Sequence, residues 1–196
     1  MQNLKDEELM LNYQKGEMLA MDELIRRYKN SVYHFALRLS QNATEAQDIA
    51  QEVFLKVHQA RDVYRPSGKF STWIFSIAHN LCVSKLRKQK WLVLWPRKND
   101  DSGELIDFKS PDPSPQEIVA DNEVSCVLKK YILGLPFLQK EALILREYEN
   151  LDYQEIAKIL NKSLGAVKTL IHRARQNLKI KFLPYLEEIS RPIDFL

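Results

Sequence analysis

Apolar residues recur at helical spacing in two stretches of the chain, on either side of a proline-rich segment. Three or four helical segments precede residues 96–115, and three or four follow, ending near residues 178–186. Residues 96–115 hold four prolines and a cluster of acids without helical or strand periodicity, which is typical of a linker. The pattern predicts an all-α protein in which two small helical domains, residues 1–95 and 116–196, are joined by a flexible acidic linker.

The clearest helix of the first domain is predicted to begin at Thr44, because residues 44–47 have the form of a capping box. Its apolar positions, between residues 46 and 57, fall on one face. A solvated polar face is the ordinary explanation of the opposite stripe, but a leucine among acids also fits a protein contact, and the residues leave both open. The stripe consists of Asp48, Gln51, Glu52 and Leu55.

A turn-rich loop, residues 62–69, precedes a second long helix predicted over residues 70–90. Rings and cations alternate through the loop and along one side of this helix, which ends in a basic cluster. Single-stranded nucleic acid is bound by such a mixture, because bases stack on rings while cations follow the phosphates. Aromatic residues also fill cores, and Trp73 lies beside Ile74 and Ile77, so partial burial is the alternative for its ring. The candidate residues are Tyr64, Arg65, Lys69, Trp73, Asn80, Arg87 and Lys88.

Residues 151–178 carry the most specific pattern of the chain. Asp152 and Glu155 form a capping box before a short helix. Asn161 suits a left-handed turn after that helix, and Ser163 suits the cap of a second helix. A short helix, a tight turn and a second helix with outward cations predict a helix-turn-helix that binds DNA. The outward residues are Lys168, Thr169, His172, Arg173 and Arg175.

Charge is distributed unevenly along the chain. Residues 1–98 hold 16 Lys and Arg against 10 Asp and Glu, a net +6, and residues 99–127 hold 1 against 8, a net −7. Residues 128–196 hold 12 against 8, a net +4, so the chain totals +3. Two basic blocks around an acidic strip suggest two polyanion-binding domains separated by a segment that nucleic acid repels.

Several classes of protein are disfavoured. No carboxylate cluster, phosphate loop or nucleophile with a base stands at a recognisable spacing, so we expect no catalysis, no metal and no cofactor. Cys82 and Cys126 lack metal-ligand spacing and fit buried reduced thiols. The polar first residues do not form a secretory signal, and the longest apolar run, residues 91–95, is far shorter than a membrane span of about 20 residues. We therefore expect a cytoplasmic protein without membrane insertion.

These motifs together resemble the extracytoplasmic-function branch of the bacterial sigma-70 family, and the resemblance covers both halves of the chain. Residues 45–57 (EAQDIAQEVFLKV) are similar to its polymerase-binding helix, and residues 70–80 (FSTWIFSIAHN) to its promoter-melting segment. Leu135-Pro136 and residues 152–175, with the run Gly165 to Lys168, are similar to its C-terminal domain.

The resemblance implies partners and roles. Asp48, Gln51 and Glu52 would contact the coiled coil of the largest subunit of core RNA polymerase. The loop at residues 62–69, with Trp73 and Asn80, would capture the unpaired strand of the minus-ten promoter element. The outward residues of the second helix would read the duplex minus-thirty-five element, and the acidic linker would thread the channels that later hold RNA. An anti-sigma factor is a further hypothesis from the resemblance.

The chain departs from the family pattern at several positions. Leu170 stands where Arg is frequent, Ala166 where Thr is frequent and Gln47 where an acid is frequent. The run at residues 91–95 is not part of the pattern, and either packs on the first domain, which we favour, or meets a regulatory partner. A helix-turn-helix transcriptional regulator that never joins the polymerase is the alternative function, but it leaves the stripe and the aromatic loop unused.

Overall fold

The computed structural model describes residues 3–93 and 123–189, so the predicted linker, the acidic strip up to residue 122 and the end of the 91–95 run lie outside the described residues. In the first half, the helices are α1 (Asp6–Gln14), α2 (Met18–Ser40), α3 (Ala43–Gln59), the short 3-10 helix η1 (Arg61–Val63) and α4 (Phe70–Val93). In the second half, they are α5 (Glu123–Leu133), α6 (Phe137–Glu147), α7 (Tyr153–Leu160) and α8 (Leu164–Ile189). The described residues contain no strand, and the predicted all-α class is confirmed.

The connection between α2 and α3 corrects one predicted boundary. Gln41 adopts a left-handed conformation (φ 59°) that ends α2, and the next residue, Asn42, already caps α3. The side-chain oxygen of Asn42 accepts a hydrogen bond from the backbone N–H of Glu45 at 3.0 Å. Thr44 therefore lies inside the first turn and is not the cap, because the two-residue turn brings a better-placed acceptor to the helix start.

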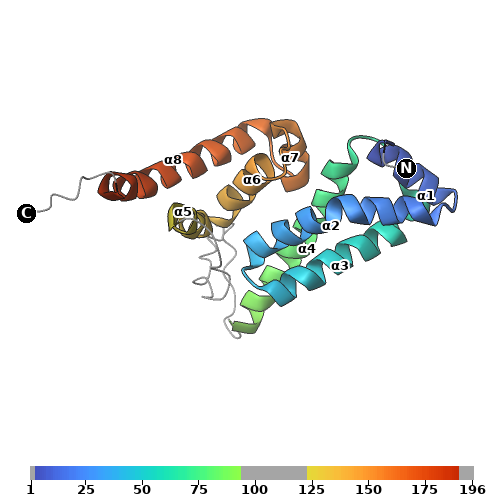
Figure 1. The fold of residues 1–196 in the computed structure, drawn as a ribbon, viewed down its shortest axis with the longest axis horizontal. Coiled ribbons are helices and arrows are strands. Elements are labelled where there is room, and N and C mark those ends of the chain that lie inside the picture. Colours follow the sequence, from blue (N-terminus) through green and yellow to red (C-terminus); the bar gives the residue numbers. More distant parts are fainter. Residues whose placement is uncertain (1–2, 94–122, 190–196) are drawn as a thin grey trace, which may run out of the picture.

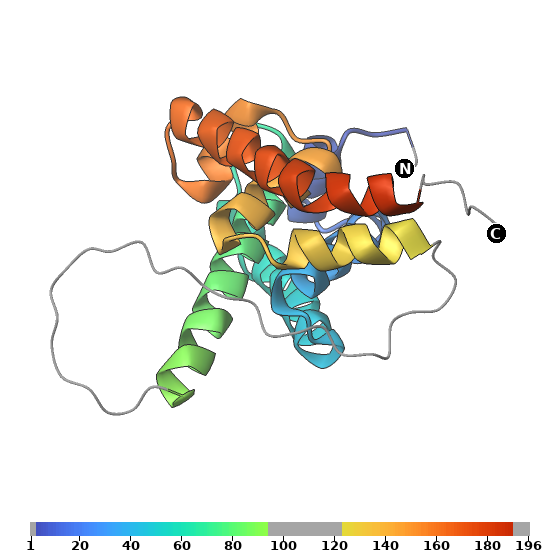
Figure 2. The same cartoon turned by 90° about the vertical axis from the view of Figure 1, so that its left-hand side faces the viewer.

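The two halves, which correspond to the two predicted domains, pack against each other through a shared hydrophobic cluster. Within the first half, α2 packs on α3 and α1, and α3 packs on α4. Across the halves, α7 packs against α4 and α6 against α2, which places the second half beside the middle of the first (Figure 1). Most of the buried side chains form one cluster that continues from Phe35 and Ile74 into Ile144 and Ile156. Beyond this contact, α4 runs away from the second half (Figure 2).

A smaller cluster joins the ends of the second half. It contains the buried residues Ile132, Leu135, Leu143 and Ala174, so α5 and α6 are tied to the middle of α8. Within residues 3–93 and 123–189, no helix combines the length and the apolar character needed to cross a membrane. Cys82 is buried, as expected, whereas Cys126 is half-buried, and neither forms a disulfide among the described residues.

Candidate nucleic-acid interface

The helix-turn-helix begins with a capping box, as the sequence predicts. The carboxylate of Asp152 accepts hydrogen bonds from the backbone N–H groups of Gln154 at 2.9 Å and Glu155 at 2.8 Å. The Oε2 atom of Glu155 accepts in return from the backbone N–H of Asp152 at 2.9 Å. The hydrogen bonds from the Glu155 and Gln154 amides lower the pKa of Asp152, so the carboxylate stays charged at the positive end of the helix dipole.

The turn and the second helix also follow the prediction. Asn161 ends α7 in a left-handed conformation (φ 51°, ψ 49°), which reverses the chain within a few residues. The hydroxyl of Ser163 accepts from the backbone N–H of Ala166 at 3.2 Å and caps α8. Val167 and Ile171 are buried against the rest of the domain, which fixes the rotation of α8 about its axis.

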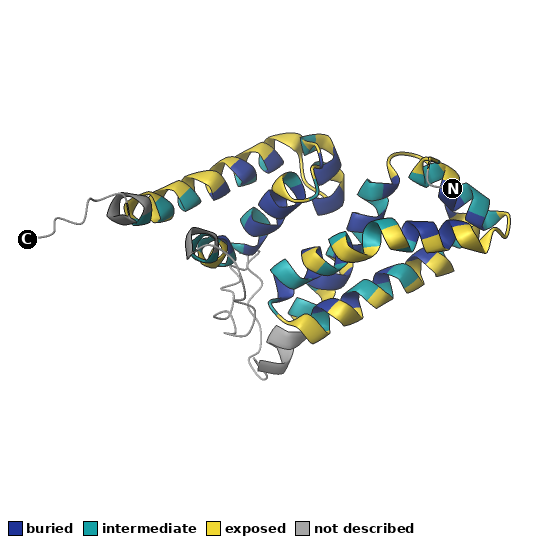
Figure 3. Ribbon diagram, viewed as in Figure 1, coloured by how far each residue is buried: buried dark blue, intermediate teal, exposed yellow. Residues whose placement is uncertain are grey.

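The outer face of α8 is open to solvent from residue 164 to residue 184 (Figure 3). Lys168, Thr169, His172 and Arg173 are all exposed, as a helix that enters the major groove requires. Arg175 is exposed too, but its guanidinium donates to Glu147 at 2.6 Å, and this bond raises the pKa of Arg175. Both side chains of the pair are about half exposed, so a phosphate can compete for the arginine.

The stripe on α3 faces solvent. Asp48 and Gln51 are exposed, Glu52 is half-buried, and Leu55 shows 53% of its surface. Lys85 of α4 lies 3.9 Å from Asp48, at the limit of an ion pair. Leu55 thus forms an exposed apolar patch beside Asp48 and Glu52 and is not part of the core of the first half.

The capture loop, residues 62–69, differs in one respect from the expectation. Arg65 and Lys69 are exposed, but Tyr64 keeps only 6% of its surface and packs against Trp73, with ring centroids 4.8 Å apart. Burial raises the pKa of Tyr64 to about 12. Phe70 and Trp73 enclose the Tyr64 ring in the core, so in this conformation the ring is not open to a base, and its role in DNA binding stays a prediction.

The other candidates of this site lie along α4. Trp73 is half-buried, as the alternative interpretation of its ring allowed, whereas Asn80 and Arg87 are exposed. The Lys88 side chain lies outside the described residues. The capture loop and α4 thus expose cations and the Asn80 amide, and the packed rings of Tyr64, Phe70 and Trp73 lie beneath the loop.

Two contacts join the capture loop region to the helix-turn-helix. The Nζ atom of Lys69 lies 3.0 Å from Oε1 of Glu155, and the hydroxyl of Thr72 donates to the same oxygen at 3.2 Å. The hydrogen bond with Glu155 raises the pKa of Lys69. A cavity of about 510 Å³ opens beside these contacts, lined by loop residues and by α7. Glu155 of the second half thus forms an ion pair with Lys69, the cation that we expected to contact a DNA phosphate.

A buried polar contact lies deeper between the halves. Nδ1 of His79 is 2.6 Å from Oε1 of Glu141, whose other carboxylate oxygen has no hydrogen-bond partner among the described residues. Burial raises the pKa of Glu141, while His79 opposes the shift. Nearby, burial raises the pKa of Glu149 to about 7 against the opposing charge of Arg38. Arg38 itself lies 3.9 Å from the ring centroid of Tyr148.

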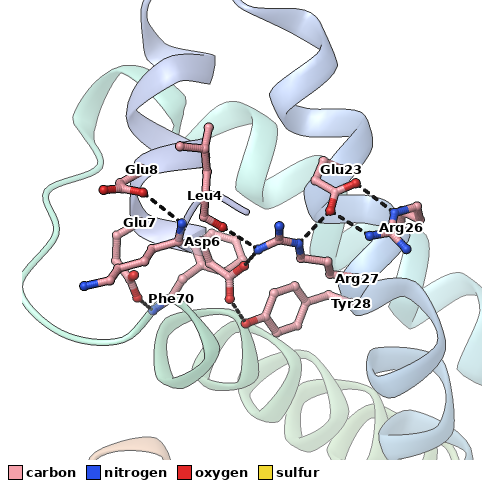
Figure 4. A network of polar contacts seen from close by, with 10 residues as sticks. Leu4, Asp6, Glu7, Glu8, Glu23, Arg26, Arg27, Tyr28 and Phe70 are labelled. Carbon is pink, nitrogen blue, oxygen red and sulfur yellow. Dashed lines mark hydrogen bonds and ion pairs between the residues drawn. The ribbon is translucent and has the colours of Figure 1, made fainter. Parts of the chain in front are cut away.

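Sequence reasoning missed the contribution of α1. The amide Nε2 of Gln14 donates to the carbonyl oxygens of Arg61 at 2.6 Å and Tyr64 at 2.9 Å, where the capture loop begins. Oε1 of Glu7 accepts from the backbone N–H of Phe70 at 2.6 Å, where the loop ends (Figure 4). Only the seven-residue spacing of these two polar residues could have hinted that they share a face of α1.

Comparison with known proteins adds family information for both halves. The family model "Sigma-70 region 2" matches residues 24–92, and "Sigma-70, region 4" matches residues 127–178. Similar proteins include the ECF RNA polymerase sigma factor SigW of Bacillus subtilis, 32% identical over 168 residues that cover 84% of this chain and 90% of SigW. The RNA polymerase sigma-H factor of Pseudomonas aeruginosa is 31% identical over 192 residues, 94% of this chain and 97% of that factor.

Solved structures agree in fold. The sigma factor RpoE of Bartonella quintana, in complex with the anti-sigma factor NepR, aligns with a TM-score of 0.62 and 25% identity over 87% of this chain and 98% of RpoE. CnrH, in complex with the cytosolic domain of CnrY, aligns with a TM-score of 0.64 and 20% identity over 95% of this chain and 99% of CnrH, which supports the fold alone.

Proposed function

We propose residue-level roles from one premise: this chain belongs to the ECF sigma factors of the sigma-70 family, which direct RNA polymerase to promoters and initiate transcription. The family is not enzymatic, and core RNA polymerase is the partner on which its function depends. A helix-turn-helix regulator that acts without the polymerase would have no use for the region 2 match over residues 24–92.

The second domain, proposed as residues 116–196, reads the duplex minus-thirty-five element. The observation that carries this proposal is the rotation of α8, which buries Val167 and Ile171 and leaves Lys168, Thr169, His172 and Arg173 outward. Arg and Lys can bond the O6 and N7 atoms of guanine in the major groove. Arg175, whose partner Glu147 is exchangeable, is better suited to a phosphate.

The first domain, proposed as residues 1–95, binds and opens the minus-ten element. Arg65, Lys69 and Arg87 supply cations along the path of the strand, and Asn80 supplies an amide able to hydrogen-bond a base. The half-exposed ring of Trp73 is the stacking surface. Tyr64 supports this ring from the core, and Lys88 keeps the role that the sequence suggested.

The stripe of Asp48, Gln51, Glu52 and Leu55 is the proposed contact with core polymerase. Charged residues around one exposed leucine fit an interface in which an apolar centre supplies affinity and complementary charges supply orientation. Lys85 is too distant from Asp48, at 3.9 Å, to hold that carboxylate firmly.

The contact between the two halves competes with DNA for one cation of the capture loop. Lys69 is paired with Glu155, and Thr72 donates to the same carboxylate, so a DNA phosphate and α7 compete for one site. The stripe on α3 and the outer face of α8 do not include Lys69, Thr72 or Glu155. Polymerase and duplex DNA can therefore bind these two surfaces whether or not the contact is broken.

We place the protein in the cytoplasm, where the polymerase and the chromosome are, and we propose control by an anti-sigma factor. The second proposal rests on RpoE, whose solved structure contains the anti-sigma factor NepR. Failure to recover any inhibitory partner from cells that do not use this factor would count against it.

Reconstitution with core polymerase tests the function as a whole. The full chain should co-purify with core enzyme, direct it to a cognate promoter and make minus-ten thymines reactive to permanganate. Binding of the chain to the same promoter without any association with core enzyme would favour the regulator instead.

A further inference from the structure

Helix α1 lies ahead of the region 2 match, which starts at residue 24, yet it touches the capture loop at both ends. Gln14 donates to the carbonyl oxygens of Arg61 and Tyr64, and Glu7 accepts from the backbone N–H of Phe70. The two side chains are seven residues apart and lie on one face of α1, two turns from each other. Between the points that they hold, residues 65–69 are all exposed.

Each contact has the polarity that its backbone partner requires. Two carbonyl oxygens can be bridged only by a donor, and the amide group of Gln14 offers two N–H bonds. The first N–H groups of α4 lack partners within the helix, and the Glu7 carboxylate accepts one of them at the positive end of the helix dipole. Both contacts are partly buried, so water does not simply replace them.

Helix α1 is itself firmly mounted on the first half. Leu9 and Met10 are completely buried, so one face of the helix belongs to the core. On the side shown in Figure 4, Asp6 accepts from Arg27 at 2.6 Å and from the Tyr28 hydroxyl at 2.5 Å. Arg27 also donates to Glu23 at 2.8 Å, which ties the network along α2.

We propose that α1 is a splint for the capture loop, with Gln14 and Glu7 as positioning residues that hold its two ends in the conformation that takes the unpaired strand. This inference rests on the proposed role of the loop in strand capture. A loop held at both ends loses less conformational freedom on binding than a free one, so preorganisation raises affinity without adding a contact to DNA.

The test uses the full chain and four substitutions, two of which should leave the loop unchanged. Gln14→Glu keeps the size of the side chain but sets carboxylate oxygens against two carbonyl oxygens, and Glu7→Ala removes the acceptor. Glu7→Gln keeps an acceptor oxygen and should restore wild-type behaviour. Glu8→Ala is the matched control, because Glu8 is exposed and accepts only from Lys5 at the start of its own helix among the bonds observed.

Amide hydrogen exchange measures how firmly α1 holds the capture loop, and it needs no DNA. Exchange in peptides that span residues 61–70 should rise about fivefold to tenfold in Gln14→Glu and in Glu7→Ala, the change expected for one lost hydrogen bond. Exchange in α8 should stay at the wild-type rate, as should exchange in residues 61–70 of Glu7→Gln and Glu8→Ala. Loop exchange at the wild-type rate in both Gln14→Glu and Glu7→Ala would overturn the splint.

Promoter opening by the holoenzyme measures whether the restraint of the loop by α1 contributes to strand capture. At equal holoenzyme and equal upstream binding, Gln14→Glu and Glu7→Ala should each lower permanganate reactivity of minus-ten thymines about fivefold. Faster loop exchange with unchanged opening would overturn the positioning role. A protein whose loop is replaced is run beside them: if it also opens the promoter, the proposed role of the loop has failed, whereas the exchange data still judge the splint.

Discussion

The two surfaces proposed to meet DNA are prepared to different degrees. On α8, Lys168 and Arg173 stand free in solvent, and the helix that carries them is fixed by a capped turn and a buried face. In the capture loop, Lys69 is paired with Glu155 of the other half, and the Tyr64 ring lies in the core. The upstream surface is therefore exposed in the free chain, whereas one cation of the downstream surface, Lys69, must exchange its contact with α7 for a phosphate.

The difference follows from what each surface must do. Duplex DNA offers base edges in its major groove without any change of structure, so a preformed helix suffices. A single strand has to be held against the free energy that returns its bases to the stack, and a site for it outside the holoenzyme would bind unpaired nucleic acid indiscriminately. The ion pair between Lys69 and Glu155 would lower the affinity of that site for a single strand in the free chain.

The largest effect should come from the stripe on α3, which serves both surfaces. We expect Asp48→Arg combined with Glu52→Lys to abolish holoenzyme formation, because reversed charges in a complementary interface cost several kcal/mol. The duplex affinity of the α8 surface should survive in the same protein. A pull-down with core enzyme and a duplex binding assay check this, and normal assembly of the double variant would reduce the stripe to a solvated face.

Replacement of the capture loop should remove strand opening alone. Tyr64 is kept because its ring belongs to the core, and Val63 with residues 65–68 become a Gly/Ser segment. Stacking is worth about 1 to 3 kcal/mol per base, so permanganate reactivity at the minus-ten element should fall to background while polymerase and duplex binding persist. Unpaired thymines as reactive as with the wild type would show that the comparison between the two surfaces is mistaken.

Arg173→Ala should affect only the upstream surface. A bidentate contact to guanine is worth about 1 to 3 kcal/mol of discrimination, so preference should flatten at one or two upstream positions. Gln176→Ala, on the same exposed side, is the control. Selection of binding sites by the holoenzyme measures the change, and a uniform loss over all sequences with a shallower salt dependence would assign Arg173 to a phosphate.

Glu155→Gln should make the two surfaces more alike. The amide oxygen can still accept from Asp152 and preserve the capping box, but the charge that holds Lys69 is lost. We expect the free chain to bind a single-stranded minus-ten oligonucleotide about fivefold more tightly, a change of roughly 1 kcal/mol for a partly exposed pair. Gln154→Ala, one residue away on the exposed side of α7, should leave the affinity unchanged. Equal affinity of Glu155→Gln and wild type would mean that this contact does not cover the loop.

The smallest effect should be a pH dependence of the contact between the halves. Burial in this contact raises the pKa of Glu149 to about 7, so the closed arrangement favours its protonated form. The closed arrangement should therefore weaken as pH rises from about 6 to 8, while Arg38 limits the change. Distances between probes on α2 and α8 should report it. Glu149→Gln should remove that part of the trend, because His79, Glu141 and the buried Lys140, whose pKa burial lowers to about 8, are common to both proteins. Identical pH profiles would exclude Glu149 as the cause.

The features that the sequence predicts correctly are those set within a few residues. The Asp152 capping box, the left-handed Asn161 and the outward face of α8 all depend on spacings of one to four residues. The misplaced cap at Thr44 is a local error, since Asn42 stands two residues earlier with the same chemistry. The resemblance to a family supplied the identity that these spacings alone left open.

The features that the sequence does not reveal join residues far apart in the chain. The bond between Thr72 and Glu155 spans 83 residues, that between Glu7 and Phe70 spans 63, and that between His79 and Glu141 spans 62. No periodicity within one helix encodes such pairs, because each depends on how whole helices dock. The burial of Tyr64 arises over a shorter span, since Phe70 and Trp73, six and nine residues later, enclose the ring.

Glu155 uses its two carboxylate oxygens for different tasks, and this constrains how the position can change. Oε2 completes the start of the helix-turn-helix, while Oε1 holds Lys69 and Thr72. Most replacements of Glu155 would remove both the capping bond to Asp152 and the contact with Lys69 and Thr72. Among the common side chains, glutamine alone keeps the first task while giving up the charge of the second. Glu155→Gln is therefore the main substitution by which evolution could weaken the contact with Lys69 and still keep the helix-turn-helix folded.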